Sequence, residues 1–244
     1  MERGPVKTPV ELRHDLQTIF QAALRAVDPG EAIRAHVRRD GQRLIVSDRT
    51  YDLGHYEALY VVGVGKAGAA MSRVLLRELT QRGVSQERIL GLVNVPRETV
   101  EPCGPIQLWP ARPAGTNQPT LEGAEGARRI LALAEQADPN DLLLCPISGG
   151  GSALLPAPVP AISLQDKQDV TALLHRCGAT IQEMNAVRKH LSLIKGGGLV
   201  RHFRGKLCIS LIISDVLGDP LDLGESLLAG LLQEGLEGIV VQPC

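Results

Sequence analysis

The chain turns at Pro146-Ile147-Ser148-Gly149-Gly150-Gly151-Ser152-Ala153-Leu154-Leu155, directly after an apolar run over residues 141–145 that predicts a buried strand. Glycine has no Cβ, so consecutive glycines let backbone N–H groups approach a ligand and form a small anion-binding concavity. Ser148 and Ser152 add hydroxyl donors. We interpret the loop as a binding site for a carboxylate or phosphate, with a plain strand-to-loop turn as the alternative.

Short apolar strands alternate with amphipathic helices along the rest of the chain. Strands are predicted over residues 43–47, 58–62, 89–95, 106–109, 141–147 and 207–214, and helices over residues 8–27, 31–37, 67–82, 120–137, 163–177 and 180–194. This pattern is typical of an α/β fold whose mostly parallel sheet carries helices on both faces. Ligands of such sheets bind beyond the carboxyl ends of the strands. The loops after Val62, Ile147 and Ser214 are expected there.

Composition excludes several classes of function. The 244 residues carry a net charge of -1 and only 2% aromatic residues, which argues against a nucleic-acid partner. No apolar run is long enough to span a membrane, and the first twelve residues do not read as a signal peptide. The five cysteines lack C-x-x-C spacing, which favours reduced thiols in a cytoplasmic protein. Cys145 and Cys208 are expected in the core.

A second glycine-rich loop, Gly63-Val64-Gly65-Lys66-Ala67-Gly68, lies between a predicted strand and a predicted helix. Its spacing matches the dinucleotide fingerprint, but the following strand ends Val93-Asn94-Val95-Pro96, without the acid that binds the ribose. What remains is a helix N-terminus carrying a lysine, which favours an anion. A lysine on a structural turn is the alternative.

The predicted helix over residues 180–194 has a polar face and an apolar face. At 100° per residue, Asn185, Arg188, Ser192 and Lys195 share one narrow face. Beside it runs an apolar stripe of Ile181, Met184, Val187, Leu191 and Ile194. We interpret the helix as the rim of an anion site, where Arg188 forms paired hydrogen bonds to a carboxylate and Lys195 acts as a point charge. The alternative is a solvated charged face. The glycines at 196–198, directly after Lys195, argue against this alternative.

Two carboxylates, Asp215 and Asp219, follow the last predicted strand. Carboxylates at a strand end can hold Mg²⁺ or accept a proton from a substrate hydroxyl. An Asx-type turn without a ligand is the alternative.

At these residues the sequence resembles the N-terminal part of the class II glycerate kinase family, whose second domain is called MOFRL. The resemblance covers roughly residues 12–222. It rests on five blocks: Val61–Gly68, Ile147–Leu155, Leu164–Gln168, Gly178–Leu199 and Ser214–Pro220.

The resemblance implies a Rossmann-like domain and phosphorylation of D-glycerate at its 2-hydroxyl by ATP with Mg²⁺. It also implies that Lys66, which stands where the family has its active-site lysine, is catalytic. Two features depart from the family. Its Gly-His-Pro-x-Pro motif is replaced by Gly115-Thr116-Asn117-Gln118-Pro119, and after Asp222 the chain does not continue into the second domain.

We therefore expect residues 1–222 to form the glycerate kinase N-terminal domain and residues 223–244 to form a divergent tail, whose sequence allows a helix and a short strand. The expected partners are glycerate and ATP, with a homodimer as one option, and the activity of this chain alone is open. An NAD(P)-dependent hydroxypyruvate reductase and a non-catalytic small-anion-binding half-domain are the alternatives. The expected site comprises catalytic Lys66, Arg188 and Asp215; binding Gly63, Gly65, Ser148, Gly149, Gly150, Gly151, Ser152, Asn185, Lys195, Gly196 and Gly197; and metal ligands Asp215 and Asp219.

Overall fold

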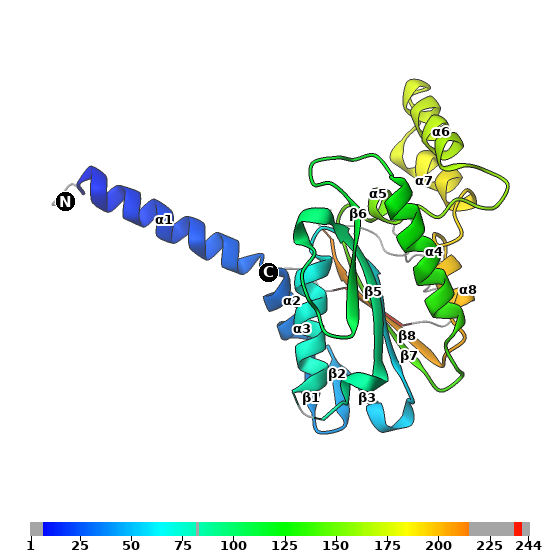
Figure 1. Ribbon diagram of the computed structural model, residues 1–244. Coiled ribbons are helices and arrows are strands. Elements are labelled where there is room, and N and C mark those ends of the chain that lie inside the picture. The colour runs from blue at the N-terminus through cyan, green and yellow to red at the C-terminus, as the bar shows by residue number, and fades with distance from the viewer. Residues whose placement is uncertain (1–6, 82, 215–236, 241–244) are drawn as a thin grey trace.

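The computed structural model describes residues 7–81, 83–214 and 237–240, which contain two sheets (Figure 1). The larger sheet has six parallel strands: β4 (Leu59–Val64), β5 (Ile89–Pro96), β6 (Ile106–Arg112), β7 (Leu142–Ser148), β8 (Leu207–Ile213) and β9 (Glu237–Val240). The smaller sheet is antiparallel and consists of β1 (Val37–Asp40), β2 (Arg43–Val46) and β3 (Arg49–Asp52). The predicted α/β fold is confirmed, whereas the small sheet was predicted only at its middle strand.

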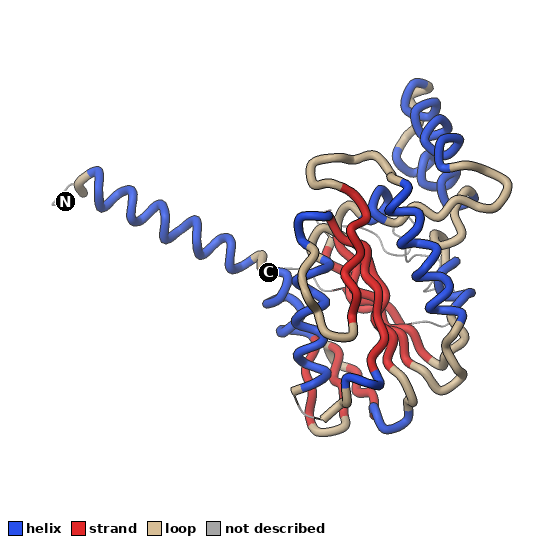
Figure 2. Tube along the Cα trace, in the orientation of Figure 1, coloured by secondary structure: helices blue, strands red, loops and turns tan. Residues whose placement is uncertain are grey.

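Helices cover both faces of the larger sheet (Figure 2). Those described are α1 (Pro9–Ala26), α2 (Pro29–His36), α3 (Gly68–Thr80), α4 (Leu121–Glu135), α5 (Gly151–Leu154), α6 (Leu164–Arg176), α7 (Ile181–His190) and α8 (Gly198–His202), with 3₁₀ turns at Leu53–His55, Gln86–Arg88 and Arg97–Thr99. α2 and α3 lie on one face, and α4 and α8 on the other (Figure 1). α6 and α7 stand beyond one end of the sheet. Among the described residues, no helix combines the length and apolarity needed to cross a bilayer.

The strand order is β6-β5-β4-β7-β8-β9, which is the 3-2-1-4-5-6 order of a Rossmann-like sheet when its strands are numbered from β4. The chain starts at β4, moves outward through β5 and β6, and then returns to place β7 on the other side of β4. The loops after β4 and β7 therefore leave adjacent strands in opposite directions, which creates the crevice where such sheets bind ligands. Both glycine-rich loops of the sequence lie at this crevice.

The central strands build two cores because their side chains alternate between the two faces of the sheet. In β4, Tyr60, Val62 and Val64 join the core under α4 and α8, while Leu59 and Val61 join the core under α3. The cysteines expected in the core, Cys145 and Cys208, are buried on neighbouring strands. The near-continuous apolar strands thus reflect burial on both faces.

One predicted helix is shorter than expected. α7 ends at His190, so Ser192 and Lys195 do not continue the helical face of Asn185 and Arg188. Tertiary pairing ends it: Ser192 forms a β-bridge with Pro158, and the N–H of Leu193 donates to the Ala157 carbonyl at 2.8 Å. The predicted apolar stripe is also partly wrong, since Ile181 and Val187 are exposed.

α1 confirms the predicted first helix but not a buried role for it. A capping box between Thr8 and Glu11 begins the helix, which extends away from the rest of the structure (Figure 1). None of its residues is buried, and its apolar side chains are exposed: Val10, Leu12, Leu16, Ile19, Phe20 and Leu24.

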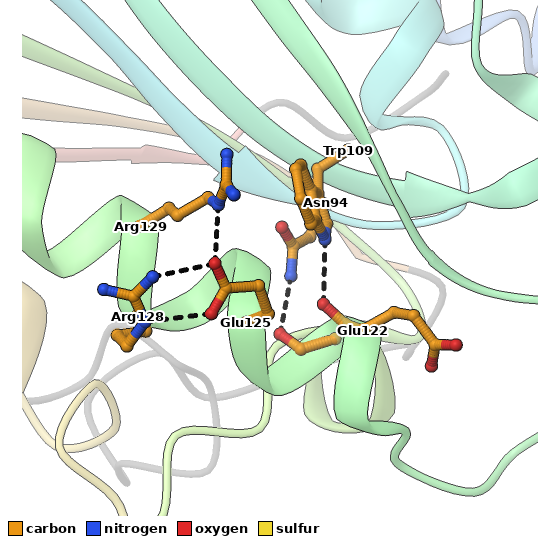
Figure 3. A network of polar contacts seen from close by, with 7 residues as sticks. Asn94, Trp109, Glu122, Glu125, Arg128 and Arg129 are labelled. Atoms are coloured by element: carbon orange, nitrogen blue, oxygen red, sulfur yellow. Dashed lines mark hydrogen bonds and ion pairs between the residues drawn. The ribbon is translucent and has the colours of Figure 1, made fainter.

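The side chain of Asn94, near the end of β5, joins β5 to α4 and α5. Figure 3 shows its contact with α4. This fully buried amide donates to the carbonyl of Gly123 in α4 at 3.1 Å and to that of Leu154 in α5 at 2.8 Å. Nearby, Trp109 donates to the Glu122 carbonyl at 2.8 Å. Asn94 thus fixes the end of the short helix that follows the triple glycine.

Replacing Asn94 by alanine should destabilise the fold by about 1–3 kcal/mol, because two buried carbonyls lose their donor. Urea unfolding of Asn94→Ala measures this. The control is Asn140→Ala, which removes an exposed amide contact to Glu57 and should cost less than about 0.5 kcal/mol. Equal losses in the two variants would contradict the bridging role of Asn94.

Candidate functional site

The two glycine-rich loops contact each other directly at the crevice. A Cβ at Gly63 would lie 2.1 Å from the Pro146 carbonyl oxygen, and one at Gly65 would lie 2.0 Å from Ser148 Oγ. Gly65 also has a φ of +141°, which L side chains rarely adopt. The N–H of Lys66 donates to the Gly149 carbonyl, and that of Ala67 donates to Ser148 Oγ, both at 3.0 Å. In the structure, Gly63 and Gly65 allow the loops to lie this close.

A cavity of about 840 Å³ opens beside the second loop. The triple glycine with its flanking serines forms one wall, and Ile212, Ile213 and Ser214 at the end of β8 form another. Further walls come from residues 117–119, Arg188 and one face of α6; the α6 residues are Lys167, Gln168, Thr171, Ala172 and His175. The cavity therefore lies beyond the carboxyl ends of β7 and β8, where the sequence predicted a ligand site.

Three cationic side chains lie at or beside this cavity, and we call Lys167, Arg188 and Lys195 the cation cluster. Lys167 and Arg188 line the cavity, whereas Lys195 does not line it but contacts Ser152, which does. Lys195 is only 6% exposed, and its Nζ donates to Ser152 Oγ at 2.8 Å. Arg188 donates from Nη1 to Asn185 Oδ1 at 3.3 Å. Lys167 is 4% exposed. Neither Lys167 Nζ nor Arg188 Nε has a hydrogen-bond partner in the described part of the chain.

The cluster is destabilised by its own charge. Burial, then the charges of Arg188, Lys167 and Lys189, lower the pKa of Lys195 to about 7 from 10.5. Burial and the charge of Arg188 lower the pKa of Lys167 to about 8. Within the described ranges, no carboxylate forms an ion pair with the three side chains. Buried cations without counter-charge are costly, so the arrangement is suited to an anion.

Lys66 approaches the same loop at Gly150. A Cβ at Gly150 would lie 3.3 Å from Lys66 Cε and 3.4 Å from Arg112 Nη2, so both side chains pass close to this glycine. Lys66 is exposed, whereas Arg112 is 1% exposed. Arg112 Nε and Nη2 have no hydrogen-bond partner among the described atoms. The structure thus brings Lys66, Arg188 and Lys195 to one glycine loop, although the roles predicted for them remain predictions.

Other predicted site residues have structural positions that do not reach the cavity. Gly196 and Gly197 have φ values of +60° and +79° and form the turn into α8; they do not line the cavity. Their predicted role in phosphate binding remains a prediction. Asn185 supports Arg188 rather than lining the cavity.

The predicted magnesium ligands, Asp215 and Asp219, lie outside the described residues. In the part that is described, no three His, Cys, Asp or Glu side chains group in a way that could hold a metal. Asp215 directly follows Ser214, which lines the cavity. A magnesium site therefore remains a prediction that depends on these two carboxylates.

Sequence reasoning missed Lys167 and Arg112. A signal for Lys167 was present, because Lys167, Thr171 and His175 recur at i, i+4 and i+8 and so share one face of α6. That face lines the cavity, whereas Leu173 of the same helix is 52% exposed. Arg112 gave no such signal, since its position depends on how β6 ends beside the loop.

The fold and the cavity define a Rossmann-like α/β domain with a cation-lined site at its topological switch point. Residues 15–226 match the family model described as "Domain of unknown function (DUF4147)". The chain belongs to this family, which is the N-terminal domain of MOFRL-type glycerate kinases.

Named relatives agree with this membership. "Glycerate kinase" of Rattus norvegicus is 40% identical over 222 residues, covering 87% of this chain and 42% of that protein. "Glycerate kinase" of Danio rerio is 41% identical over 218 residues, covering 85% of this chain and 42% of that protein. "Putative hydroxypyruvate reductase" of Agrobacterium vitis is 36% identical over 211 residues, covering 86% and 43%. The chain therefore spans less than half the length of these relatives.

Two crystal structures share the fold. A protein of Pyrococcus horikoshii matches with a TM-score of 0.74 at 31% identity, covering 91% of this chain and 48% of that one. "Glycerate kinase" of Thermotoga maritima matches with a TM-score of 0.69 at 30% identity, with the same coverage.

The close approach of the two loops predicts that Gly65→Ala is far more damaging than a matched change elsewhere. Gly178 also has a positive φ, +71°, but nothing lies within 4 Å of a Cβ built there. Gly178→Ala should cost about 1 kcal/mol from backbone strain alone, whereas Gly65→Ala adds a clash with Ser148 and should cost at least about 3 kcal/mol. Chemical unfolding of both variants measures the difference, and similar losses would show that the loops are not packed as described.

The lowered pKa of Lys195 predicts how stability depends on pH in the absence of ligand. In the unfolded chain this lysine stays charged up to about pH 10. The folding cost of its burial is therefore full below pH 7, declines as the pH rises from 7 to 10.5, and is absent above that range.

Lys195→Met, which keeps an unbranched side chain one atom shorter and without charge, should accordingly stabilise the chain by about 2–4 kcal/mol at pH 6. The gain should shrink steadily toward pH 9.5. Unfolding of wild type and variant in parallel at each pH cancels the contributions of other groups. A gain that is absent at pH 6, or independent of pH, would contradict the buried charged state.

Proposed function

We propose that this chain carries the phosphate-binding half of an ATP-dependent glycerate 2-kinase, which transfers the γ-phosphoryl group of ATP to the 2-hydroxyl of D-glycerate. The observation that carries the proposal is the cation cluster, which has no counter-charge among the described residues, beside a glycine loop at the switch point. The glycerate kinases among its relatives support the substrates. The same proposal includes a cytoplasmic location, a homodimer, and a division into a domain over residues 1–222 and a tail over 223–244. Within that tail, β9 pairs with β8, so the tail adds a strand to the sheet of the domain.

Phosphoryl transfer forms a bond between the glycerate oxygen and the γ-phosphorus and breaks the bond from that phosphorus to the β–γ bridging oxygen, leaving ADP. The chain's contribution is positioning and neutralisation of negative charge. Arg188 and Lys195 would bind phosphate oxygens from one side of the loop, and Lys66 would approach from the Gly150 side. Asp215 is the proposed acceptor of the hydroxyl proton.

Mg²⁺, when bound, would neutralise phosphate charge and needs few protein ligands because the phosphates supply oxygens themselves. Asp215 and Asp219 are the candidates for those ligands. The described residues fit the polyphosphate better than the metal, since they offer cations and backbone rather than grouped carboxylates at the cavity.

The reductase alternative has one observation against it. At the end of β5, where a dinucleotide site carries an acid for the ribose, the chain places Asn94, which is buried and bonded to two backbone carbonyls. The chain spans less than half the length of its relatives, so the comparisons do not test whether this span alone turns over substrate. We therefore retain binding without turnover as the second candidate.

Turnover tests the proposal directly. We expect the purified chain to convert D-glycerate and ATP to 2-phosphoglycerate and ADP in the presence of Mg²⁺, measured by release of ADP. Lys66→Met and Arg188→Met should each lower kcat/KM by about 100-fold or more, as expected for losing a group that stabilises transition-state charge. Lys206→Met, at an exposed lysine before β8, is the control and should leave kcat/KM unchanged.

The same preparations separate the alternatives. Oxidation of NADH or NADPH by hydroxypyruvate, without any release of ADP from glycerate, would replace the kinase with the reductase. Binding of glycerate or ATP without turnover under any of these conditions would favour the half-domain.

A further inference from the structure

α6 buries a single side chain, and that side chain is a lysine. Lys167 is 4% exposed, although helices normally bury their apolar residues, and apolar Leu173 of the same helix is 52% exposed. Lys167 lines the cavity, and its Nζ has no hydrogen-bond partner among the described residues. An unpaired ammonium group is among the most costly groups to bury. The position of Lys167 thus needs an explanation beyond packing.

The charges around Lys167 show what kind of ligand would stabilise it. Arg188 and Lys195 stand close enough to disfavour the charged forms of their neighbours, and Lys195 is held on Ser152 of the glycine loop. A single carboxylate can compensate only one of these three cations. A chain of phosphates carries three or more negative charges at neutral pH, together with many acceptor oxygens. Charge balance therefore favours a polyphosphate over a monoanion.

A second pair of cations contacts the glycine loop at a different residue. Lys66 and Arg112 both pass close to Gly150, whereas Lys195 contacts Ser152 two residues further along. The unpartnered Nε and Nη2 of Arg112 form the edge of a guanidinium group that pairs with a carboxylate in two hydrogen bonds. Lys66 and Arg112 are therefore the pair we assign to the carboxylate of the small acid.

We propose that Lys167, Arg188 and Lys195 form a polyphosphate subsite and that Lys167 is a direct phosphate ligand in it. The proposal deepens the proposed function, on which it rests for naming ATP as the source of the phosphates. The chemistry recognised is the phosphate chain itself, whether it belongs to a nucleotide or is inorganic.

Calorimetric titration of the full chain with inorganic tripolyphosphate, ATP and D-glycerate tests this subsite. Lys167→Met should lower the binding affinity for both tripolyphosphate and ATP by about tenfold or more, which is the loss expected for one hydrogen bond between charged groups. The same substitution should change D-glycerate affinity by less than about threefold, because we assign the carboxylate to Lys66 and Arg112 rather than to Lys167. Lys206→Met serves as the control and should leave all three affinities unchanged.

A second variant shows whether a loss of binding comes from the lost charge or from misfolding. Lys167→Arg keeps the charge and should retain tripolyphosphate affinity within about threefold of wild type. The proposal is overturned if wild type does not bind tripolyphosphate or if Lys167→Met binds it as tightly as wild type does. It is also overturned if the arginine and methionine variants lose the same amount of tripolyphosphate affinity. A fourth contrary result would be a loss of D-glycerate affinity in Lys167→Met as large as its loss of tripolyphosphate affinity.

Comparison with the turnover assay separates the two proposals. Polyphosphate binding that depends on Lys167, in a chain that never phosphorylates glycerate, would support the subsite and refute the kinase. Kinase activity with tripolyphosphate affinity insensitive to Lys167 would refute the subsite and leave the kinase standing. ATP binding that depends on Lys167, without any tripolyphosphate binding, would refute recognition of the phosphate chain alone.

Discussion

The structure depends on positive charge that is buried beside a glycine loop and has no counter-charge among the described residues. Lys167 and Lys195 are each less than a tenth exposed, and burial lowers the pKa of both. Within the described residues no carboxylate offsets the cost of desolvating these cations, and a bound anion would offset it. The proposed site would thus combine a loss of stability with a gain in affinity, a balance that is common at functional sites.

The rest of the fold holds this charge in place. The order of strands puts β4 and β7 side by side, so their loops diverge and leave a crevice. Gly65 lets the first loop lie against Ser148, and Asn94 fixes the end of the helix after the triple glycine. α6 and α7 then bring Lys167 and Arg188 over the same loop. Positioning by rigid elements is what phosphoryl-transfer sites require.

Sequence patterns predicted the fold well because its strands are continuous apolar runs between amphipathic helices. They also located both glycine loops, whose chemistry is local. They failed at residues 191–195, where pairing of Leu193 with Ala157 ends α7 early, because contacts between distant segments leave no periodic signal. The burial of Lys167 was missed for a related reason: a lysine at a helix surface is normally solvated, and only the tertiary structure covers it.

Diffraction from crystals soaked with tungstate, a dianion with the shape of phosphate and a strong anomalous signal, tests the central claim most directly. We predict an anomalous peak within hydrogen-bonding distance of Lys167 Nζ, Arg188 Nε and the backbone of the loop over residues 148–152. A carboxylate of the chain in contact with these cations, and no tungstate there at saturating concentration, would contradict it. The buried charge would then have an internal partner and would not require a ligand.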